Sequence, residues 1–427
     1  MGRASPLQPV QHGADIWRSD LYGCGVHCAA RRKGMIHMRC AAVMIATALA
    51  TGLAGCGHTD RLASVPVAQL ERATVLGIPK ARFYVDQPRQ ILAEARQAFD
   101  REVAYNRSIE RSMPSAKYLA LSGGGDDGAF GAGLLVGWTE RGDRPSFKLV
   151  TGISTGALIA PFAFLGPEYD GALTAVYTGI DQKDILEKRP LLAALTDDAM
   201  SDTTPLYRLI SRYLDDKMIA QIAREYDRGR LLLIATTNLD AGRPVIWNIG
   251  AIARSGHPKS QELIRRILLA SASIPGAFPP VMFDVDVNGS PHQELHVDGG
   301  AVAQSFLYPA SVSLRSSASF ERARSAYIIR NAKLSAAPSE TERRTLSIAG
   351  RAITTLITSN GVGDLYRMYT TTKRDGVAFN LAYIGNDFTE PHPGLFNRDY
   401  MNKLFGYGRS KARSGYPWQS VPPGLAS

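Results

Sequence analysis

The chain has 427 residues, of which 45% are hydrophobic and 21% charged, and its 49 Lys and Arg against 39 Asp and Glu give a formal net charge of +10. This length allows one large α/β domain with extensions, or two or three smaller domains. The 40 Gly and 24 Pro follow no period, and there is no internal repeat or heptad run, which excludes collagen-like, solenoid and coiled-coil proteins. The basic residues are spread along the chain without a stripe, so we expect no nucleic-acid partner.

The first 55 residues predict a secretory signal region. An apolar stretch over residues 41–54 is too short to cross a bilayer, which needs about 20 residues, but it has the length of the apolar core of a signal peptide. The basic residues before it are Arg31, Arg32, Lys33 and Arg39. Met35 or Met38 would be a more usual start for such a signal, so we interpret residues 1–34 as an over-extended start.

The signal region ends in Leu53, Ala54, Gly55 and Cys56. A bulky apolar residue, two small residues and then Cys resemble the cleavage box of bacterial lipoproteins, which implies that Cys56 is diacylated and becomes the first residue of the mature protein. Gly57 is not the Asp that signals inner-membrane retention in the lipoproteins it resembles, so we expect a lipid anchor in the outer membrane of a bacterial cell envelope. An ordinary signal peptide with a chance Cys is the alternative.

Residues 56–116 are polar and helix-forming, and we expect an N-terminal extension whose clearest helix covers 89–105. From residue 117, apolar runs typical of strands alternate with helical patterns. Strands are expected over 117–122, 147–151, 231–238, 294–297, 326–330 and 377–384, and helices from 127 to 138, after Ser154, and over 261–272, 343–372 and 395–409. Strands that are apolar on both faces predict an α/β fold with a mostly parallel sheet covered by helices on each side. The tail over 414–427 is expected to be loose.

Ser154 lies between Gly152 and Gly156, after an expected strand and before an expected helix. This G-x-S-x-G pattern is typical of a nucleophile elbow, in which small flanking residues permit a tight turn that exposes the serine hydroxyl at a helix N-terminus. Pro161 lies inside the helical pattern, so we expect that helix to be short or kinked. The alternative is a glycine-rich turn whose serine only caps the helix.

A glycine-rich turn over residues 123–131 satisfies G-x-G-x-x-G between a strand and a helix. A dinucleotide site would use such a turn for pyrophosphate, but Asp126 and Asp127 would repel a dianion, and Asp143, the acid expected further on, lies in a polar segment. Backbone N–H groups of this turn suit instead the oxyanion of an acyl-transfer intermediate. The expected oxyanion-hole residues are Gly123, Gly124, Gly125, Asp126 and Gly128. For the side chains of Asp126 and Asp127 we expect helix capping.

Asp298 ends a short expected strand and precedes Gly299 and Gly300, so its side chain can reach into a site without crowding. The glycine-rich turn, G-x-S-x-G, a small-residue block over 270–280 that contains F-P-P, and D-G-G follow one another as in the patatin-like phospholipase family, which the chain resembles best over 117–300. The resemblance implies a three-layer α/β/α fold and hydrolysis of lipid acyl esters by a Ser–Asp dyad without His. Carried over by position, Ser154 is the nucleophile and Asp298 the base.

The chain departs from the family pattern at Asp127, where the family often has Lys or Arg. If that positive charge holds an anionic headgroup, neutral esters or lysolipids become candidate substrates beside phospholipids. A direct dyad also requires that Asp298 be partly desolvated, so that its carboxylate is basic enough to accept a proton. We therefore interpret residues 117–385 as a patatin-like acyl hydrolase domain acting on membrane lipids, without a cofactor or metal, and residues 386–427 as a C-terminal helix and tail; the oligomeric state stays open.

Three alternatives remain open. A Ser–His–acid esterase would need His392, in a Pro-rich loop, as its base. A metal site would use the side chains that share one face if residues 292–298 are extended, although a solvated strand face is expected there. These side chains are His292, Glu294, His296 and Asp298. A lipoprotein that binds lipid without catalysis would keep the fold and lose the chemistry.

Overall fold

The computed structural model describes residues 61–188, 199, 201–314, 322–334 and 340–425. The signal region and Cys56 lie outside these ranges. The lipid anchor and the outer-membrane location therefore stay predictions from the sequence. In the described part of the chain, no helix combines the length and the apolar composition needed to cross a bilayer.

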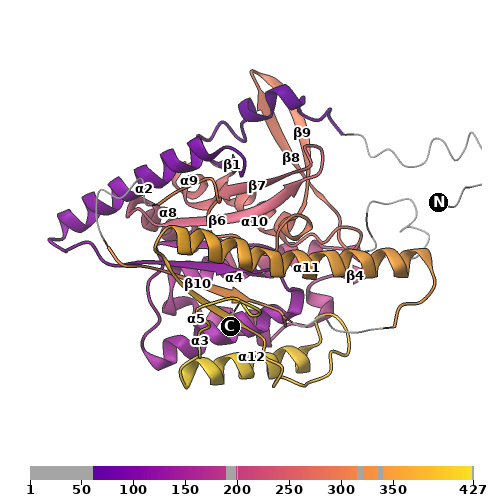
Figure 1. Cartoon of the computed structure of the whole chain (residues 1–427). Helices are drawn as coiled ribbons and strands as arrows, with labels where there is room; N and C mark the ends of the chain where they lie inside the picture. The colour runs from indigo at the N-terminus through magenta and orange to yellow at the C-terminus, as the bar shows by residue number, and fades with distance from the viewer. Residues whose placement is uncertain (1–60, 189–198, 200, 315–321, 335–339, 426–427) are drawn as a thin grey trace, which may run out of the picture. The chain divides into compact units, whose positions relative to one another are not determined.

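A nine-stranded sheet organises the protein (Figure 1). Its main path runs β1-β7-β6-β3-β2-β10-β11, and the hairpin of β8 and β9 joins it through β6. The strands are β1 (Arg82–Tyr84), β2 (Ala116–Leu121), β3 (Leu149–Gly152), β6 (Leu231–Asn238), β7 (Arg243–Asn248), β8 (Val281–Val287), β9 (Ser290–Asp298), β10 (Arg324–Arg330) and β11 (Ala378–Tyr383), while β4 (Glu187–Lys188) and β5 (Ser201–Asp202) form a separate pair. The pairings from β11 through β10, β2 and β3 to β6 are parallel, whereas β1, β7, β8 and β9 pair antiparallel.

Successive side chains of the parallel strands pack into two separate apolar clusters. In β2, Leu119 and Leu121 belong to one cluster, and Tyr118 and Ala120 belong to the other. The side chains of β6 divide in the same way. Because strand side chains point alternately to opposite faces, both faces of the sheet are buried, which explains the continuous apolar runs in the sequence.

Helices cover both faces of the sheet and give three layers. Helices α3, α4, α5 and α12 contribute to one apolar cluster, and α2 and α11 contribute to the other (Figure 1). The helices are α2 (Pro88–Ser108), α3 (Gly128–Arg141), α4 (Thr155–Leu165), α5 (Asp170–Thr178), α7 (Thr204–Tyr213), α8 (Asp216–Asp227), α9 (Ile249–Arg254), α10 (Ser260–Ser271), α11 (Thr345–Arg374) and α12 (Arg398–Arg413). The predicted three-layer α/β/α fold is confirmed.

Three features differ from the sequence expectations. Strand β1 lies in the N-terminal extension but pairs with β7, so part of the extension belongs to the main sheet. The short strand expected over 294–297 is the end of β9, which forms a long hairpin with β8. The tail expected to be loose is held to β11, because Gln419 and Leu381 exchange two backbone hydrogen bonds of 2.9 and 3.0 Å, and the Tyr416 hydroxyl accepts from the N–H of Tyr383 at 3.0 Å.

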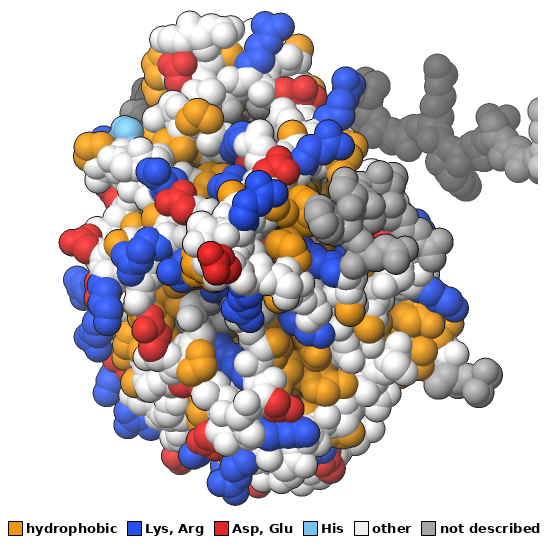
Figure 2. Space-filling view, turned by 90° about the vertical axis from the view of Figure 1, so that its left-hand side faces the viewer, with side chains coloured by type: hydrophobic (Ala, Val, Ile, Leu, Met, Phe, Trp, Pro, Cys, Tyr) orange, Lys and Arg blue, Asp and Glu red, His pale blue; other side chains and the backbone are white. Residues whose placement is uncertain are grey.

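Charges of both signs are mixed on the face shown in Figure 2, where Asp and Glu lie between scattered Lys and Arg side chains. Several of the exposed charges form pairs, such as Arg254 with Asp227 at 2.8 Å. Exposed pairs of this kind contribute little to stability. We therefore attribute the stability of the fold to the two apolar clusters rather than to its surface charges.

Candidate active site

Ser154 occupies the turn between β3 and α4. Its backbone has φ 55° and ψ −128°, a conformation that residues other than glycine rarely adopt and that costs about 1–3 kcal/mol. The turn needs glycine on both sides, because a Cβ on Gly152 would lie 2.5 Å from the carbonyl oxygen of Gly156, and a Cβ on Gly156 would overlap that of Leu121. The strained turn puts Ser154 at the N-terminus of α4, which is a short helix of 11 residues with Pro161 inside it, as a nucleophile elbow predicts.

Strand β6 brings Asp298 to the serine. Gly152, the last residue of β3, pairs with Ile234, and Asp298, the last residue of β9, pairs with Thr236 two positions further along β6. Both neighbours share one edge of β6, because β7 occupies the other edge. Strand residues advance about 3.3 Å each, so the ends of β3 and β9 lie about 7 Å apart along β6. The sheet register therefore places Ser154 and Asp298 together although they are distant in the sequence.

The carboxylate of Asp298 is buried and accepts a backbone hydrogen bond. Asp298 is 4% exposed and Ser154 is 6% exposed. Oδ1 of Asp298 accepts from the N–H of Gly300 at 2.7 Å, and the hydroxyl of Ser154 is close enough to the carboxylate to lower its pKa. Burial raises the pKa of Asp298 from its usual 3.8 to about 7, because the Ser154 hydroxyl and the N–H of Gly300 offset only part of the desolvation. A base with a pKa near neutral can take up a proton and return it.

Two buried serines at the end of α10 fix the backbone of this pair. The hydroxyl of Ser271 accepts from the N–H of Ser154 at 3.0 Å and donates to the carbonyl of Ala235 in β6 at 2.8 Å. The carbonyl of Ser273 accepts from the N–H of Asp298 at 2.8 Å. Both serines belong to the small-residue block that resembles the family, but the sequence gives no indication of these contacts.

The glycine-rich turn lies directly beside Ser154. A Cβ on Gly123 would lie 3.2 Å from the Cβ of Ser154. Gly124 must be glycine, because a Cβ there would overlap the carbonyl oxygen of Asn331. Gly125 has φ 59°, and the position of its missing Cβ faces open space. The turn is therefore closed toward the protein and open on the side of Gly125.

Some backbone N–H groups of this turn donate hydrogen bonds within the protein, and others do not. The N–H of Gly123 donates to the carbonyl of Gln304 at 2.9 Å, and the N–H of Gly128 donates within the turn. These two residues, expected as oxyanion donors, therefore use their N–H groups inside the protein. Among the described residues no partner accepts from the N–H groups of Gly124, Gly125 and Asp126. The structure thus reduces the expected set to these three donors.

Residues from the second half of the chain support the turn. Nδ2 of Asn331 donates to the carbonyl of Ser122 at 2.9 Å, and its Oδ1 accepts from the N–H of Gly131 at 3.0 Å. Gln304 is held in turn by Asp364 of α11, whose Oδ2 accepts from the N–H of Gln304 at 2.6 Å. The sequence analysis missed Asn331, Gln304 and Asp364, because single polar residues carry no local pattern that indicates a distant contact.

Asp126 and Asp127 do not cap the helix that follows them, so that expectation is wrong. Oδ2 of Asp126 accepts from Nε2 of His392 at 3.0 Å and from the N–H of Phe396 at 2.8 Å. Oδ1 of Asp127 accepts from the hydroxyl of Tyr400 at 2.6 Å. Burial raises the pKa of Asp127 to about 6, although the Tyr400 hydrogen bond opposes this shift. Both acids therefore bind the C-terminal part of the chain, and one of them, Asp127, stands where the family pattern often has Lys or Arg.

Glu294 and His296 are buried, so the expected solvated strand face is also wrong. Arg82 of β1 forms a two-pronged ion pair with Glu294, and Nε2 of His296 lies 3.1 Å from Oε2 of Glu294. Although burial opposes it, hydrogen bonds from His296 and Arg82 lower the pKa of Glu294 to about 2. Among the described residues no group of three or more His, Cys, Asp or Glu is arranged to hold a metal ion. This network stabilises the strand that ends at Asp298.

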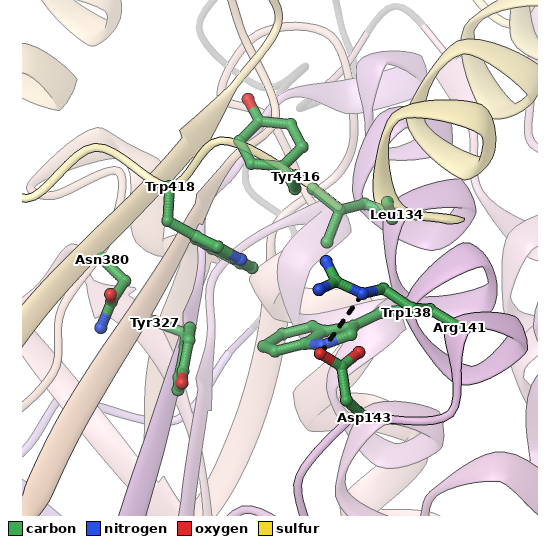
Figure 3. A pocket seen from close by; sticks show the side chains of 9 residues that line it. Leu134, Trp138, Arg141, Asp143, Tyr327, Asn380, Tyr416 and Trp418 are labelled. Carbon is green, nitrogen blue, oxygen red and sulfur yellow. Dashed lines mark ion pairs between the residues drawn. The ribbon is translucent and has the colours of Figure 1, made fainter. Parts of the chain in front are cut away.

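A cavity of about 290 Å³ lies at the C-terminal end of α3, away from Ser154 (Figure 3). Its aromatic lining consists of Trp138, Tyr327, Tyr416 and Trp418, whose neighbouring ring centroids are 4.9 to 5.3 Å apart. Arg141 and Asp143 form an exposed ion pair of 3.4 Å beside these rings. The glycine-rich turn precedes the other end of α3, and a 14-residue helix is about 21 Å long, so this cavity is separate from the serine site.

A smaller apolar cavity of about 40 Å³ lies along α4. Leu158, Pro161 and Phe162 of α4 line one side, and the remaining lining residues are Val176, Leu206, Leu209, Ile210, Tyr213, Leu214, Met218 and Leu268. Because α4 begins next to Ser154, the apolar lining starts about one helical turn from the serine. An apolar surface in this place can contact a hydrocarbon chain.

A three-layer fold with a serine elbow, a buried acid and free N–H groups beside the serine is the arrangement of an acyl hydrolase. Residues 119–310 match the family model described as Patatin-like phospholipase. Residues 119–310 therefore form a patatin-like phospholipase domain, the domain of a lipid acyl hydrolase, as the sequence predicted. No curated protein matches the chain. Among solved structures it is similar to the crystal structure of VipD from Legionella pneumophila, with 12% identity, a TM-score of 0.34, and coverage of 71% of this chain and 67% of that chain.

Proposed function

We propose that the protein hydrolyses acyl ester bonds of membrane glycerolipids through a Ser154–Asp298 dyad. The observation that carries this proposal is the convergence of Ser154 and the buried Asp298 at the ends of β3 and β9, where the pKa of Asp298 is raised to about 7. Serine is a weak nucleophile unless a base takes its proton. Asp298 is ionised over a useful range of pH and is more basic than an exposed carboxylate.

The reaction proceeds in two acyl-transfer steps. Oγ of Ser154 attacks the ester carbonyl while its proton passes to Asp298, and the N–H groups of Gly124, Gly125 and Asp126 stabilise the negative oxygen that forms. Collapse of this intermediate breaks the ester bond, and Asp298 returns the proton to the leaving alcohol. Water then attacks the acyl group on Ser154 with Asp298 again as base, which releases the fatty acid and restores the serine.

The surroundings of the dyad support a lipid substrate. The apolar side chains along α4 start about one helical turn from Ser154, so the neighbourhood of the serine is apolar on this side, although the cavity there is too small to hold a whole acyl chain. The carboxylates of Asp126 and Asp127 are engaged by His392 and Tyr400, so neither acid directly repels a headgroup as a free surface charge. Phospholipids, lysolipids and neutral acyl esters are therefore all candidate substrates, and a panel of these lipids is the assay that ranks them.

The test is the Ser154→Ala variant, measured on phospholipid vesicles, on a soluble p-nitrophenyl ester, and by labelling with a fluorophosphonate. We expect turnover to fall by at least about 10⁴-fold and labelling to disappear, with unchanged thermal unfolding. Ser255→Ala, at an exposed serine after α9, is the matched control. Retained hydrolysis in the Ser154 variant would contradict the mechanism, and a wild-type protein that resists the label would favour the non-catalytic lipid-binding alternative.

A further inference from the structure

The C-terminal segment holds the side chain of Asp126, one of the residues of the oxyanion turn. Asp126 is 3% exposed, and its Oδ2 accepts from both Nε2 of His392 and the N–H of Phe396. Asp126 is also one of the three residues whose N–H groups have no partner among the described residues. Its side chain and its backbone N–H therefore belong to one rigid unit, with the side chain held by residues from the other end of the chain.

The segment that holds Asp126 is itself fixed in an unusual conformation. Phe396 has φ 56°, which is rare for a residue with a side chain, and this backbone directs its N–H to Asp126. Helix α12 starts directly after it, where the side chain of Asn397 accepts from the N–H of Tyr400 at 3.0 Å. The rings of His392 and Tyr400 are 4.6 Å apart at an angle of 68°. The loop thus has several independent supports, which is expected where a strained backbone is retained.

Helix α12 packs tightly along α3, the helix that begins where the oxyanion turn ends. A Cβ on Gly133 would overlap the backbone of Phe405, and a Cβ on Gly137 would overlap that of Arg409. Tyr400 of α12 also donates to Asp127 at 2.6 Å. The loop that carries His392 is therefore fixed relative to the turn by a close helix–helix contact as well as by its hydrogen bonds.

We propose that His392 is a positioning residue, which through Asp126 holds the N–H groups of the oxyanion turn in place. This inference rests on the proposed function, because it assumes that Gly124, Gly125 and Asp126 receive the negative oxygen. His392 does not touch the reacting atoms: its Nε2 is directed to Asp126, whereas the group that receives the hydroxyl proton of Ser154 is Asp298. Its role is to donate one hydrogen bond, and it takes no proton from the serine.

The charges around His392 agree with a donor role. Asp126 and Asp127 face the ring from the turn, Tyr400 packs on it from α12, and Lys333 acts on Asp127 from the segment after β10. The hydrogen bond to Asp126 raises the pKa of His392. A charged donor binds a carboxylate more strongly than a neutral one, so this pair contributes most when the ring is protonated.

The experiment compares His392→Ala with His392→Gln, because glutamine offers an N–H near the position of Nε2 but cannot serve as a general base. Turnover of a soluble p-nitrophenyl ester is measured, so that vesicle binding plays no part. We expect His392→Ala to lower kcat by about 10- to 100-fold, less than the loss of an entire oxyanion donor, with KM changed less than 2-fold. We expect His392→Gln to retain at least about a third of the wild-type kcat. His257→Gln, in the loop before α10, is the matched histidine control.

The outcomes separate this inference from the proposed function. Wild-type kcat in His392→Ala overturns the inference and leaves the dyad intact. A loss of about 10⁴-fold in both His392 variants overturns it in favour of the Ser–His–acid alternative. If His392→Ala does not fold, the His392→Gln variant alone tests the inference. A retained kcat in that variant supports a positioning role for His392, and a lost kcat contradicts it. A double variant with Asp126→Ala should lose no more than the larger of the two single losses, because the residues act through one contact; independent losses would contradict the coupling.

Discussion

Replacing Asp298 by Asn tests the dyad through stability as well as through activity. The D298N side chain keeps the shape of the aspartate and an oxygen that can accept from the N–H of Gly300, but it cannot take the proton of Ser154. We therefore expect turnover to fall by at least about 10⁴-fold, as for loss of the nucleophile. The same substitution should make the folded protein more stable above neutral pH, because it removes a buried group that must ionise.

The size of this gain follows from the pKa of Asp298, which burial raises from 3.8 to about 7. Between these values the folded protein binds the proton more tightly than the unfolded chain, so wild-type stability falls as the pH rises through this range. Each pKa unit corresponds to 1.36 kcal/mol, and the full cost above about pH 8 is therefore about 4 kcal/mol. At about pH 5 most of this cost is absent, because Asp298 is still protonated in the folded state.

The assay is urea unfolding of the wild type and of D298N at about pH 5 and about pH 8.5. We expect the free energy of unfolding of D298N to gain about 3 kcal/mol relative to the wild type between the two conditions. Asp284→Asn, at an exposed acid of the adjacent strand β8, controls for the loss of a surface charge. A difference between D298N and the wild type that does not change with pH would refute the argument that burial raises the pKa of Asp298.

Two further predictions concern the structure around the dyad. Gly124→Ala should destabilise the protein severely, because the added Cβ meets the backbone of Asn331, whereas Gly125→Ala should cost only about 1–2 kcal/mol of backbone strain; equal thermal unfolding of the two variants would contradict this geometry. Glu294→Gln should lower the free energy of unfolding by about 3–5 kcal/mol, because it leaves the guanidinium of Arg82 buried without its counter-charge. Denaturation at neutral pH measures this loss, and a change below about 1 kcal/mol would show that the pair is solvated.

The features that depend on local sequence could be predicted from it. Strand β6 matches the expected range over 231–238, because its apolar run is continuous and bounded by turns. The elbow at Ser154 could be predicted because the strand, the glycines and the following helix lie within one short segment. The same holds for the family, since its motifs are short and follow one another in a fixed order. Local pattern was therefore sufficient for the fold class and for the position of the serine turn.

The features that depend on distant contacts could not be predicted. Glu294 and His296 look like a solvated strand face because the neutralising residue, Arg82, is 212 positions away from Glu294. Asp126 resembles a helix cap until the structure shows His392 beside it, 266 positions further on. The N–H of Gly123 fits an oxyanion donor in sequence but is used by a carbonyl from another loop. In each case the role of the residue depends on a contact with a residue far away in the sequence, and the spacing of residues within the motif does not indicate which residue that is.

Because β6 fixes the positions of both Ser154 and Asp298, the polypeptide between α4 and β6 is free to diversify. Its described helices α5, α7 and α8, together with α4, supply most of the apolar lining beside the serine. Changes in the length or composition of this polypeptide leave the pairing of Gly152 and Asp298 with β6 untouched. Selection can therefore alter which hydrocarbon chains contact the site without changing the relative positions of Ser154 and Asp298. This is usual where variable segments connect the strands of a constant sheet.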